Sequence, residues 1–168
     1  MSGTVPNKPL RKHPSKFEPG EEFIPFELEV TPELANYCMM GTNNRNPWFM
    51  GESPFGGAVA PPIMIQALSA RVRALYLWGD FVGPVFVEPP GIHCAFDATY
   101  INPVKVGEKI TVKGKCKDNY EKRGRRYIEI ETTVYGQDGR LCTRYVGTHS
   151  FLSEAKPEGK AEAKKEGE

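Results

Sequence analysis

The sequence lacks a clear excess of charge of either sign. Its 168 residues include 22 Lys and Arg against 21 Asp and Glu, so the formal net charge is +1 at pH 7. Proteins that bind nucleic acids usually show a pronounced basic excess. The balance therefore argues against a nucleic-acid partner.

Long apolar runs are missing too. No stretch reaches the roughly 18 apolar residues of a membrane-spanning helix, and residues 1–20 hold no apolar segment of the kind that signal peptides use. The sequence therefore predicts no membrane span and a cytoplasmic protein.

Cysteine and histidine are scarce and scattered. The four cysteines are Cys38, Cys94, Cys116 and Cys142, and the three histidines are His13, His93 and His149. None forms the close pairs that are typical of metal ligands, and reduced thiols are the rule where no secretory signal is present. We therefore expect no metal site and no disulfide framework.

The composition predicts one domain between two tails. Apolar residues make up 39% of the chain and charged residues 26%, which is ordinary for a soluble globular protein. Residues 1–20 are rich in Pro, Lys and Gly, and residues 154–168 contain nothing larger than Ala that would join a core. We assign residues 21–153 to the domain and both ends to solvated tails.

Periodicity predicts the elements of this domain. Residues 23–31 are expected to form a half-buried strand, because residues 26–30 alternate between apolar and acidic side chains. Thr31 with Pro32 then opens a short helix through Met40. A loop rich in Gly, Asn and Pro follows. One long helix is expected from Pro61–Pro62 to Gly79; it is apolar on most faces, so other structure must wrap around it.

The second half of the chain predicts antiparallel strands. They span residues 93–101, 110–116, 127–135 and 141–152, and the last two are joined by an Asp-Gly turn at residues 137–139. About five strands with one buried helix give an α+β domain, in which a curled antiparallel sheet wraps around the long central helix.

Three segments in this order resemble the MaoC-like dehydratase and (R)-specific enoyl-CoA hydratase family, particularly its N-terminal-half type. They are YCMMGTNNRNPWF at 37–49, FGGAVAPPIMI at 55–65, and the strand pair from Ile101 to Leu141. The resemblance covers roughly residues 21–153 and implies a hot-dog fold. It also implies hydration of trans-2-enoyl thioesters of coenzyme A or acyl carrier protein, or the reverse dehydration, with the thioester as substrate and no further cofactor.

Members of this family use an Asp and a His that hold one water between them, and a backbone N–H at the start of the central helix that binds the thioester oxygen. Aligning Asn46–Pro47 with the family's Asn-Pro puts Asn44 at the Asp position and Phe49 at the His position. Neither side chain exchanges a proton near neutral pH. Where many members have His-Gly, this chain has Pro61–Pro62, and Pro62 has no N–H.

These differences predict weak or absent chemistry in the chain alone. An oxyanion donor contributes about 2.7–4 kcal/mol to lowering the barrier, and an acid/base group contributes roughly 10²–10⁴-fold. Candidate substitutes are His93, His149 and Glu52, although strand histidines are more often packed and a loop acid is more often solvated. No catalytic residue is therefore assigned.

Binding groups are better preserved than catalytic ones. The resemblance and the residue types assign substrate binding to Asn46, Trp48, Phe49, Phe55, Gly56, Gly57, Ala60, Pro62, Ile63 and Met64. The aromatic and Met side chains suit an acyl tunnel, with plain core packing as the alternative. A basic turn, Lys122, Arg123, Arg125 and Arg126, suits the phosphates of coenzyme A, with a solvated turn as the alternative.

Three functions follow for comparison. The first is a dyad-lacking, acyl-binding subunit that pairs with a catalytic MaoC-like hot-dog subunit in a heterodimer or heterotetramer. The second is a stand-alone noncanonical hydratase or thioesterase, in which case a homodimer is expected. The third is a non-enzymatic binder of acyl-CoA. The sequence identifies neither the acyl group nor the carrier.

Overall fold

The computed structural model describes residues 16–69 and 92–152. The elements in chain order are β1 (Phe26–Glu29), α1 (Pro32–Thr42), α2 (Pro47–Met50), α3 (Pro62–Ser69), β2 (Ile92–Tyr100), β3 (Lys109–Lys122), β4 (Arg125–Tyr135) and β5 (Leu141–Leu152). The predicted α+β class with five antiparallel strands is confirmed.

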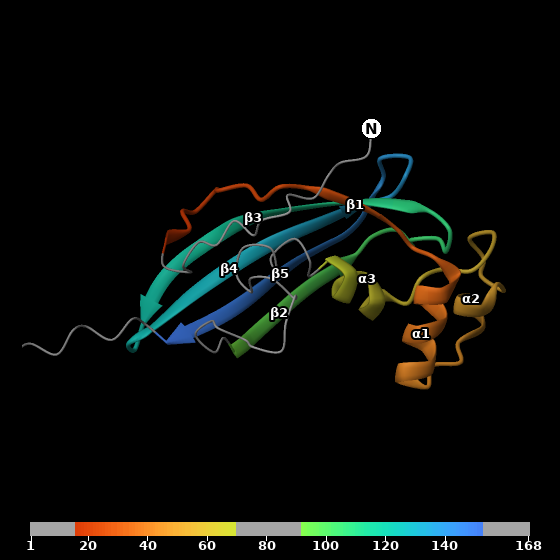
Figure 1. Ribbon diagram of the computed structural model, residues 1–168, viewed down its shortest axis with the longest axis horizontal. Helices are drawn as coiled ribbons and strands as arrows, with labels where there is room; N and C mark the ends of the chain where they lie inside the picture. Colours follow the sequence, from red (N-terminus) through yellow and green to blue (C-terminus); the bar gives the residue numbers. More distant parts are fainter. Residues whose placement is uncertain (1–15, 70–91, 153–168) are drawn as a thin grey trace, which may run out of the picture.

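The five strands form one curved antiparallel sheet in the order β1-β3-β4-β5-β2 (Figure 1). The helices α1 and α2 lie at one end of this sheet, and the turn that joins β3 to β4 lies at the other end. We call these the helix end and the hairpin end. β3 is 14 residues long, so the two ends are about 45 Å apart along the strand.

Boundaries follow the predictions closely at the end of the chain and less closely at the start. β5 begins and ends where predicted, whereas β3 continues to Lys122 and β1 is only four residues long. The short helix α2 was not predicted, because its Asn-Pro start reads equally as a turn. Of the predicted central helix, the structure describes Pro62–Ser69; residues 70–79 lie outside the described part of the chain.

The start of α1 confirms its sequence signal. The Thr31 hydroxyl accepts a hydrogen bond from the Leu34 N–H at 3.3 Å, and Pro32 occupies the first turn. At the other end, Asn43 takes a left-handed conformation (φ 48°), which Asn tolerates better than most residues. α1 is therefore capped at both ends, by Thr31 and by Asn43.

The inner face of the sheet carries the apolar core. On β4, Ile128, Ile130 and Val134 are buried there, and Met64 and Ile65 of α3 belong to the same cluster. One boundary needs correction: Phe17, which we placed in the N-terminal tail, is 3% exposed and packs its ring against Phe23 at 5.6 Å between centroids. The ordered domain therefore begins before residue 21, because an apolar ring this large gains by burial.

The outer face of the sheet is held by charge pairs across strands. Glu131 on β4 lies between Lys115 of β3, at 3.0 Å, and Arg144 of β5. Burial alone would raise the pKa of Glu131, but the hydrogen bonds from Arg144 and Lys115 outweigh it and hold that pKa below the usual value of 4.5. The carboxylate therefore ties three neighbouring strands together.

Replacing Glu131 with Gln is expected to lower the free energy of unfolding by about 0.5–1 kcal/mol at pH 7. Because the folded-state pKa is depressed, the stabilisation is present above pH 4.5 and is lost as the pH falls through the folded pKa. Urea unfolding of wild type and Glu131→Gln at pH 7 and pH 3 measures this. The control is Glu27→Gln, because Glu27 is exposed. If Glu131→Gln lowered the free energy of unfolding equally at pH 7 and pH 3, the stabilisation would not come from the charge of Glu131.

Candidate functional site

A short pair of backbone segments joins the parts of the candidate site. Residues 58–60 run antiparallel to residues 104–106: Val106 N–H donates to the Ala58 carbonyl at 3.0 Å, and Ala60 N–H donates to the Val104 carbonyl at 2.8 Å. We call this pairing the backbone clasp. It fixes the segment before α3 against the segment before β3.

Two further backbone hydrogen bonds connect the clasp to the segments next to α1 and α2. Gly107 N–H donates to the Val30 carbonyl at 2.7 Å, just before α1, and Val59 N–H donates to the Trp48 carbonyl of α2 at 3.0 Å. The starts of α1 and α3, the helix α2 and the loop at residues 51–57 are therefore positioned together at the helix end.

The loop that resembles the hydratase motif is built from two successive side-chain turns. The Asn44 Oδ1 accepts the N–H of Asn46 at 3.0 Å, and the Asn46 Oδ1 accepts the N–H of Trp48 at 3.0 Å, which caps α2. Asn44 is exposed and Phe49 is half-buried. The two positions that the resemblance aligns with the Asp and the His thus carry a turn-forming amide and a hydrocarbon ring, and neither side chain exchanges a proton near neutral pH.

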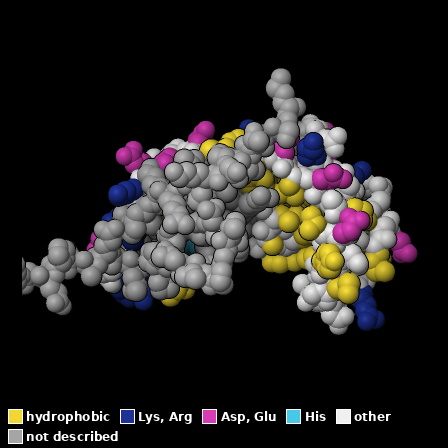
Figure 2. All heavy atoms as spheres, in the orientation of Figure 1, with side chains coloured by type: hydrophobic (Ala, Val, Ile, Leu, Met, Phe, Trp, Pro, Cys, Tyr) yellow, Lys and Arg dark blue, Asp and Glu magenta, His cyan; other side chains and the backbone are white. Residues whose placement is uncertain are grey.

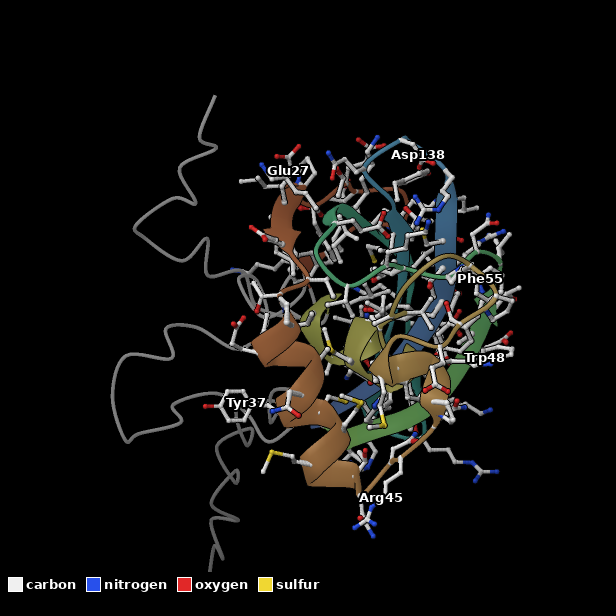
Figure 3. All side chains as sticks on the ribbon, turned by 90° about the vertical axis from the view of Figure 1, so that its right-hand side faces the viewer. Glu27, Tyr37, Arg45, Trp48, Phe55 and Asp138 are labelled. Carbon is white, nitrogen blue, oxygen red and sulfur yellow. The ribbon has the colours of Figure 1, made fainter. Side chains whose placement is uncertain are left out.

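Two predicted binding residues form an aromatic pair beside this loop. The rings of Trp48 and Phe55 meet edge to face, with centroids 5.8 Å apart. The side chains are 46% and 42% exposed. Figure 3 shows them on one side of the molecule, with Tyr37 of α1 on the opposite side. They offer an apolar contact at the surface rather than core packing.

The glycines that follow Phe55 need their flexibility. Gly56 and Gly57 have φ values of 78° and 117°, which side-chain-bearing residues rarely adopt. A Cβ at Gly56 would meet only the Lys105 ammonium, at 3.9 Å. The backbone here is therefore open to close approach.

The start of α3 offers one free backbone donor. Pro61 and Pro62 have no N–H, and the Met64 N–H donates to the Pro61 carbonyl at 2.9 Å. In the described part of the chain, the Ile63 N–H has no acceptor, and Ile63 is 54% exposed. Met64 is 4% exposed and Ala60 5% exposed, so both contribute to the core and not to an open tunnel wall.

A hollow of about 700 Å³ opens next to Phe55 at the helix end. Its lining comprises Phe55, Asn102, Pro103, Lys105, Glu108, Gln137, Asp138 and Arg140. The sequence analysis assigned none of the last seven to a site; its only signals were the turn at residues 137–139 and the position of all seven in the segment from Ile101 to Leu141, which carries part of the resemblance.

Arg140 lines this hollow and makes several contacts within it. Its guanidinium contacts Glu108 at 2.7 Å, Asp138 at 2.8 Å and the Pro103 carbonyl at 2.9 Å. Hydrogen bonds from Arg140 hold the pKa of Asp138 below its usual value. The network joins the β4–β5 turn to the clasp and keeps the hollow in shape.

The spare acid/base candidates do not gather at the loop. His93 on β2 and His149 on β5 stack at 4.6 Å between ring centroids, towards the hairpin end. His93 is seven residues before the helix end of β2, about 23 Å along the strand. His93 is exposed and His149 is buried. Glu52 lies near the loop and is exposed.

The basic turn also lies at the hairpin end. Lys122 pairs with Arg125 across a two-residue turn, in which Arg123 and Gly124 have φ values of 52° and 70°. Arg126 is engaged by Glu121 at 3.5 Å. Within one chain, these cations lie at the opposite end of the sheet from the loop, so the structure does not bring the two predicted groups together.

The described residues show neither a metal cluster nor a membrane-spanning helix. Within residues 16–69 and 92–152, no three His, Cys, Asp or Glu side chains come together as a metal site would require. None of the helices described there has the length and apolarity to span a bilayer.

Comparison with known proteins gives the fold a name. No protein-family model and no curated protein matches the chain by sequence. Solved structures do match it. An R-hydratase, PhaJ1 of Pseudomonas aeruginosa, is 17% identical with a TM-score of 0.65, covering 84% of this chain and 86% of its own.

Two further solved structures are similar. A MaoC-like dehydratase from Rhodospirillum rubrum is 14% identical with a TM-score of 0.63, over 83% of this chain and 96% of its own. A C-terminally truncated HadBC (3R-hydroxyacyl-ACP dehydratase) complex from Mycobacterium tuberculosis is 18% identical with a TM-score of 0.66, over 81% and 98%. The predicted hot-dog fold, shared with MaoC-like dehydratases and (R)-hydratases, is confirmed.

The role of Asn46 gives a test of the loop. Asn46→Ala removes the cap of α2 and is expected to cost about 1 kcal/mol locally, seen as faster hydrogen exchange at the Trp48 amide. Asn46→Ser retains a capping oxygen and is the matched control. Equal protection in wild type and Asn46→Ala would show that the cap does not hold this loop.

Proposed function

We propose that this chain is the dyad-lacking, acyl-thioester-binding subunit of a MaoC-like enoyl-thioester hydratase or dehydratase. The observation that carries the proposal is the loop. In a hot-dog domain with hydratase-like neighbours, Asn44 and Phe49 stand where the resemblance puts the acid and the base. Asn44 is used instead to hold the turn before Asn46.

What remains suits binding rather than chemistry. The exposed pair of Trp48 and Phe55 offers an apolar surface, and the free Ile63 N–H offers one hydrogen bond to a thioester oxygen. One donor without an acid/base pair orients a substrate but does not move its protons. The water would then be added or removed by the dyad of a second subunit.

The two edges of the sheet favour such a partner. β1 is four residues long, carries Glu27 and Glu29 and follows Pro25, all of which discourage strand addition. β2 has nine residues without Lys, Arg or Pro, Asp97 is its only acidic residue, and all but Ala98 are exposed. A long edge with one acidic residue and exposed aromatic side chains fits the edge of another hot-dog domain better than the short β1 edge with its two Glu.

One of the similar structures is itself a complex, HadBC, whose name describes it as a 3R-hydroxyacyl-ACP dehydratase. We therefore propose a heterodimer or heterotetramer with a catalytic hot-dog subunit, and place a homodimer second. The stand-alone hydratase is less favoured, because neither described histidine lies at the loop.

The decisive experiment compares enoyl-CoA hydration by the purified chain, by a catalytic MaoC-like partner and by the two co-purified. We expect turnover that requires the partner and rises in the mixture. Asn44→Ala and Phe49→Leu in this chain are expected to change KM of the complex more than kcat, because both residues shape the binding loop and no proton passes through them. Turnover by the chain alone that falls with Asn44→Ala would refute the proposal, and binding without turnover in any mixture would favour a plain acyl-CoA binder.

Assembly through β2 has its own test. Ala95→Lys puts a solvated charge in the middle of this edge and is expected to reduce the assembled fraction in analytical ultracentrifugation. Glu27→Lys places the same side chain on the β1 edge and is expected to leave assembly intact. Equal assembly of both variants would exclude β2 as the interface.

A further inference from the structure

The hollow beside Phe55 combines one aromatic ring with polar groups that are not already used. The Asn102 side chain donates to the Leu141 carbonyl, at 2.8 Å, and its Oδ1 has no partner within residues 16–69 and 92–152. The Gln137 Oε1 accepts the Lys109 N–H, at 3.4 Å, and its amino group has no partner among the same residues. The hollow therefore presents one free acceptor and one free donor next to a half-exposed ring.

Lys105 supplies the free positive charge of the hollow. Arg140 is engaged by Glu108, Asp138 and a carbonyl, whereas the Lys105 ammonium has no ion pair within the described residues and lies beside the open Gly56 backbone. The two cations of the lining, Lys105 and Arg140, balance its two carboxylates, Glu108 and Asp138. The Lys105 ammonium can therefore hold one phosphate group of a ligand, and any further phosphates of that ligand would stay in solvent outside the hollow.

From these groups we infer that the hollow binds the adenosine 3′-phosphate end of coenzyme A. The adenine ring stacks on Phe55, its polar edge faces the open amide groups of Asn102 and Gln137, and the 3′-phosphate meets Lys105. The inference rests on the proposed function for the choice of ligand. It favours coenzyme A over acyl carrier protein, because the pantetheine arm of a carrier protein bears no nucleoside.

The location of the hollow supports this choice over the basic turn. Lys105 belongs to the backbone clasp, next to Val104, which bonds the residue two positions before α3. Arg123 and Arg125 lie at the hairpin end, about 45 Å away along β3. A thioester held at the start of α3 can extend to the hollow within one chain but not to the hairpin.

The test is calorimetric titration of the full chain, without partner or turnover, with coenzyme A, 3′-dephospho-coenzyme A and pantetheine. We expect affinity to fall in that order. Lys105→Ala should weaken coenzyme A binding about tenfold or more and abolish the preference for coenzyme A over its dephospho form. Phe55→Ala should weaken binding of both nucleotides but not of pantetheine.

Two controls make the outcome decisive. Lys113→Ala removes an exposed lysine that lies over the Tyr135 ring on the outer face, and should bind like wild type. Arg123→Ala with Arg125→Ala removes the hairpin cations. Loss of binding in the hairpin variant with normal binding in Lys105→Ala, or no preference of the wild type for coenzyme A, overturns the inference.

The same data separate the two hypotheses. If coenzyme A binds through Lys105 but no partner ever supports hydration, the proposed function fails and the nucleotide site stands. If hydration occurs in a complex that accepts pantetheine thioesters as well as coenzyme A thioesters, and Lys105→Ala has no effect, the nucleotide site fails and the proposed function stands.

Discussion

The backbone clasp is the constraint on which the candidate site depends. Four backbone hydrogen bonds around residues 58–60 and 104–107 hold the starts of α1 and α3, the helix α2 and the glycine loop against the sheet. Backbone groups buried in such a crossing must be paired, so the segments have little freedom to separate. The positions of Trp48, Phe55 and Lys105 all follow from this one crossing.

The loop before α2 is held by amide side chains that form two successive turns. An Asn side chain accepts a backbone N–H and so preserves a turn, but it cannot exchange a proton at neutral pH. Asn44 and Asn46 do this in succession, and the two prolines at α3 leave Ile63 as the free donor of the described first turn. Neither Asn44 nor Phe49 transfers a proton at neutral pH, whereas the Ile63 N–H is a hydrogen-bond donor.

Polarity is distributed unevenly over the molecule. Hydrophobic side chains gather around α1, α2 and α3 at the helix end (Figure 2), while charge pairs centred on Glu131 hold the outer face of the sheet. One sheet edge is short and acidic, and the other is long and exposed. The two edges of the sheet therefore differ in length and in charge.

The sequence by itself determined most of the elements and the residue types of the loop before α2. Alternation of apolar and charged residues located β4, the Asp-Gly turn located the start of β5, and Thr31 located α1. The types of Asn44 and Phe49 were read directly from the sequence, because these are local properties of the chain. The tertiary structure alone decided which distant residues meet. It joined Phe55 to Lys105 and Arg140, buried Phe17, and separated the loop from His93 and the basic turn. Sequence spacing carries no information about which ends of long strands lie together, and that arrangement is set only when the sheet pairs.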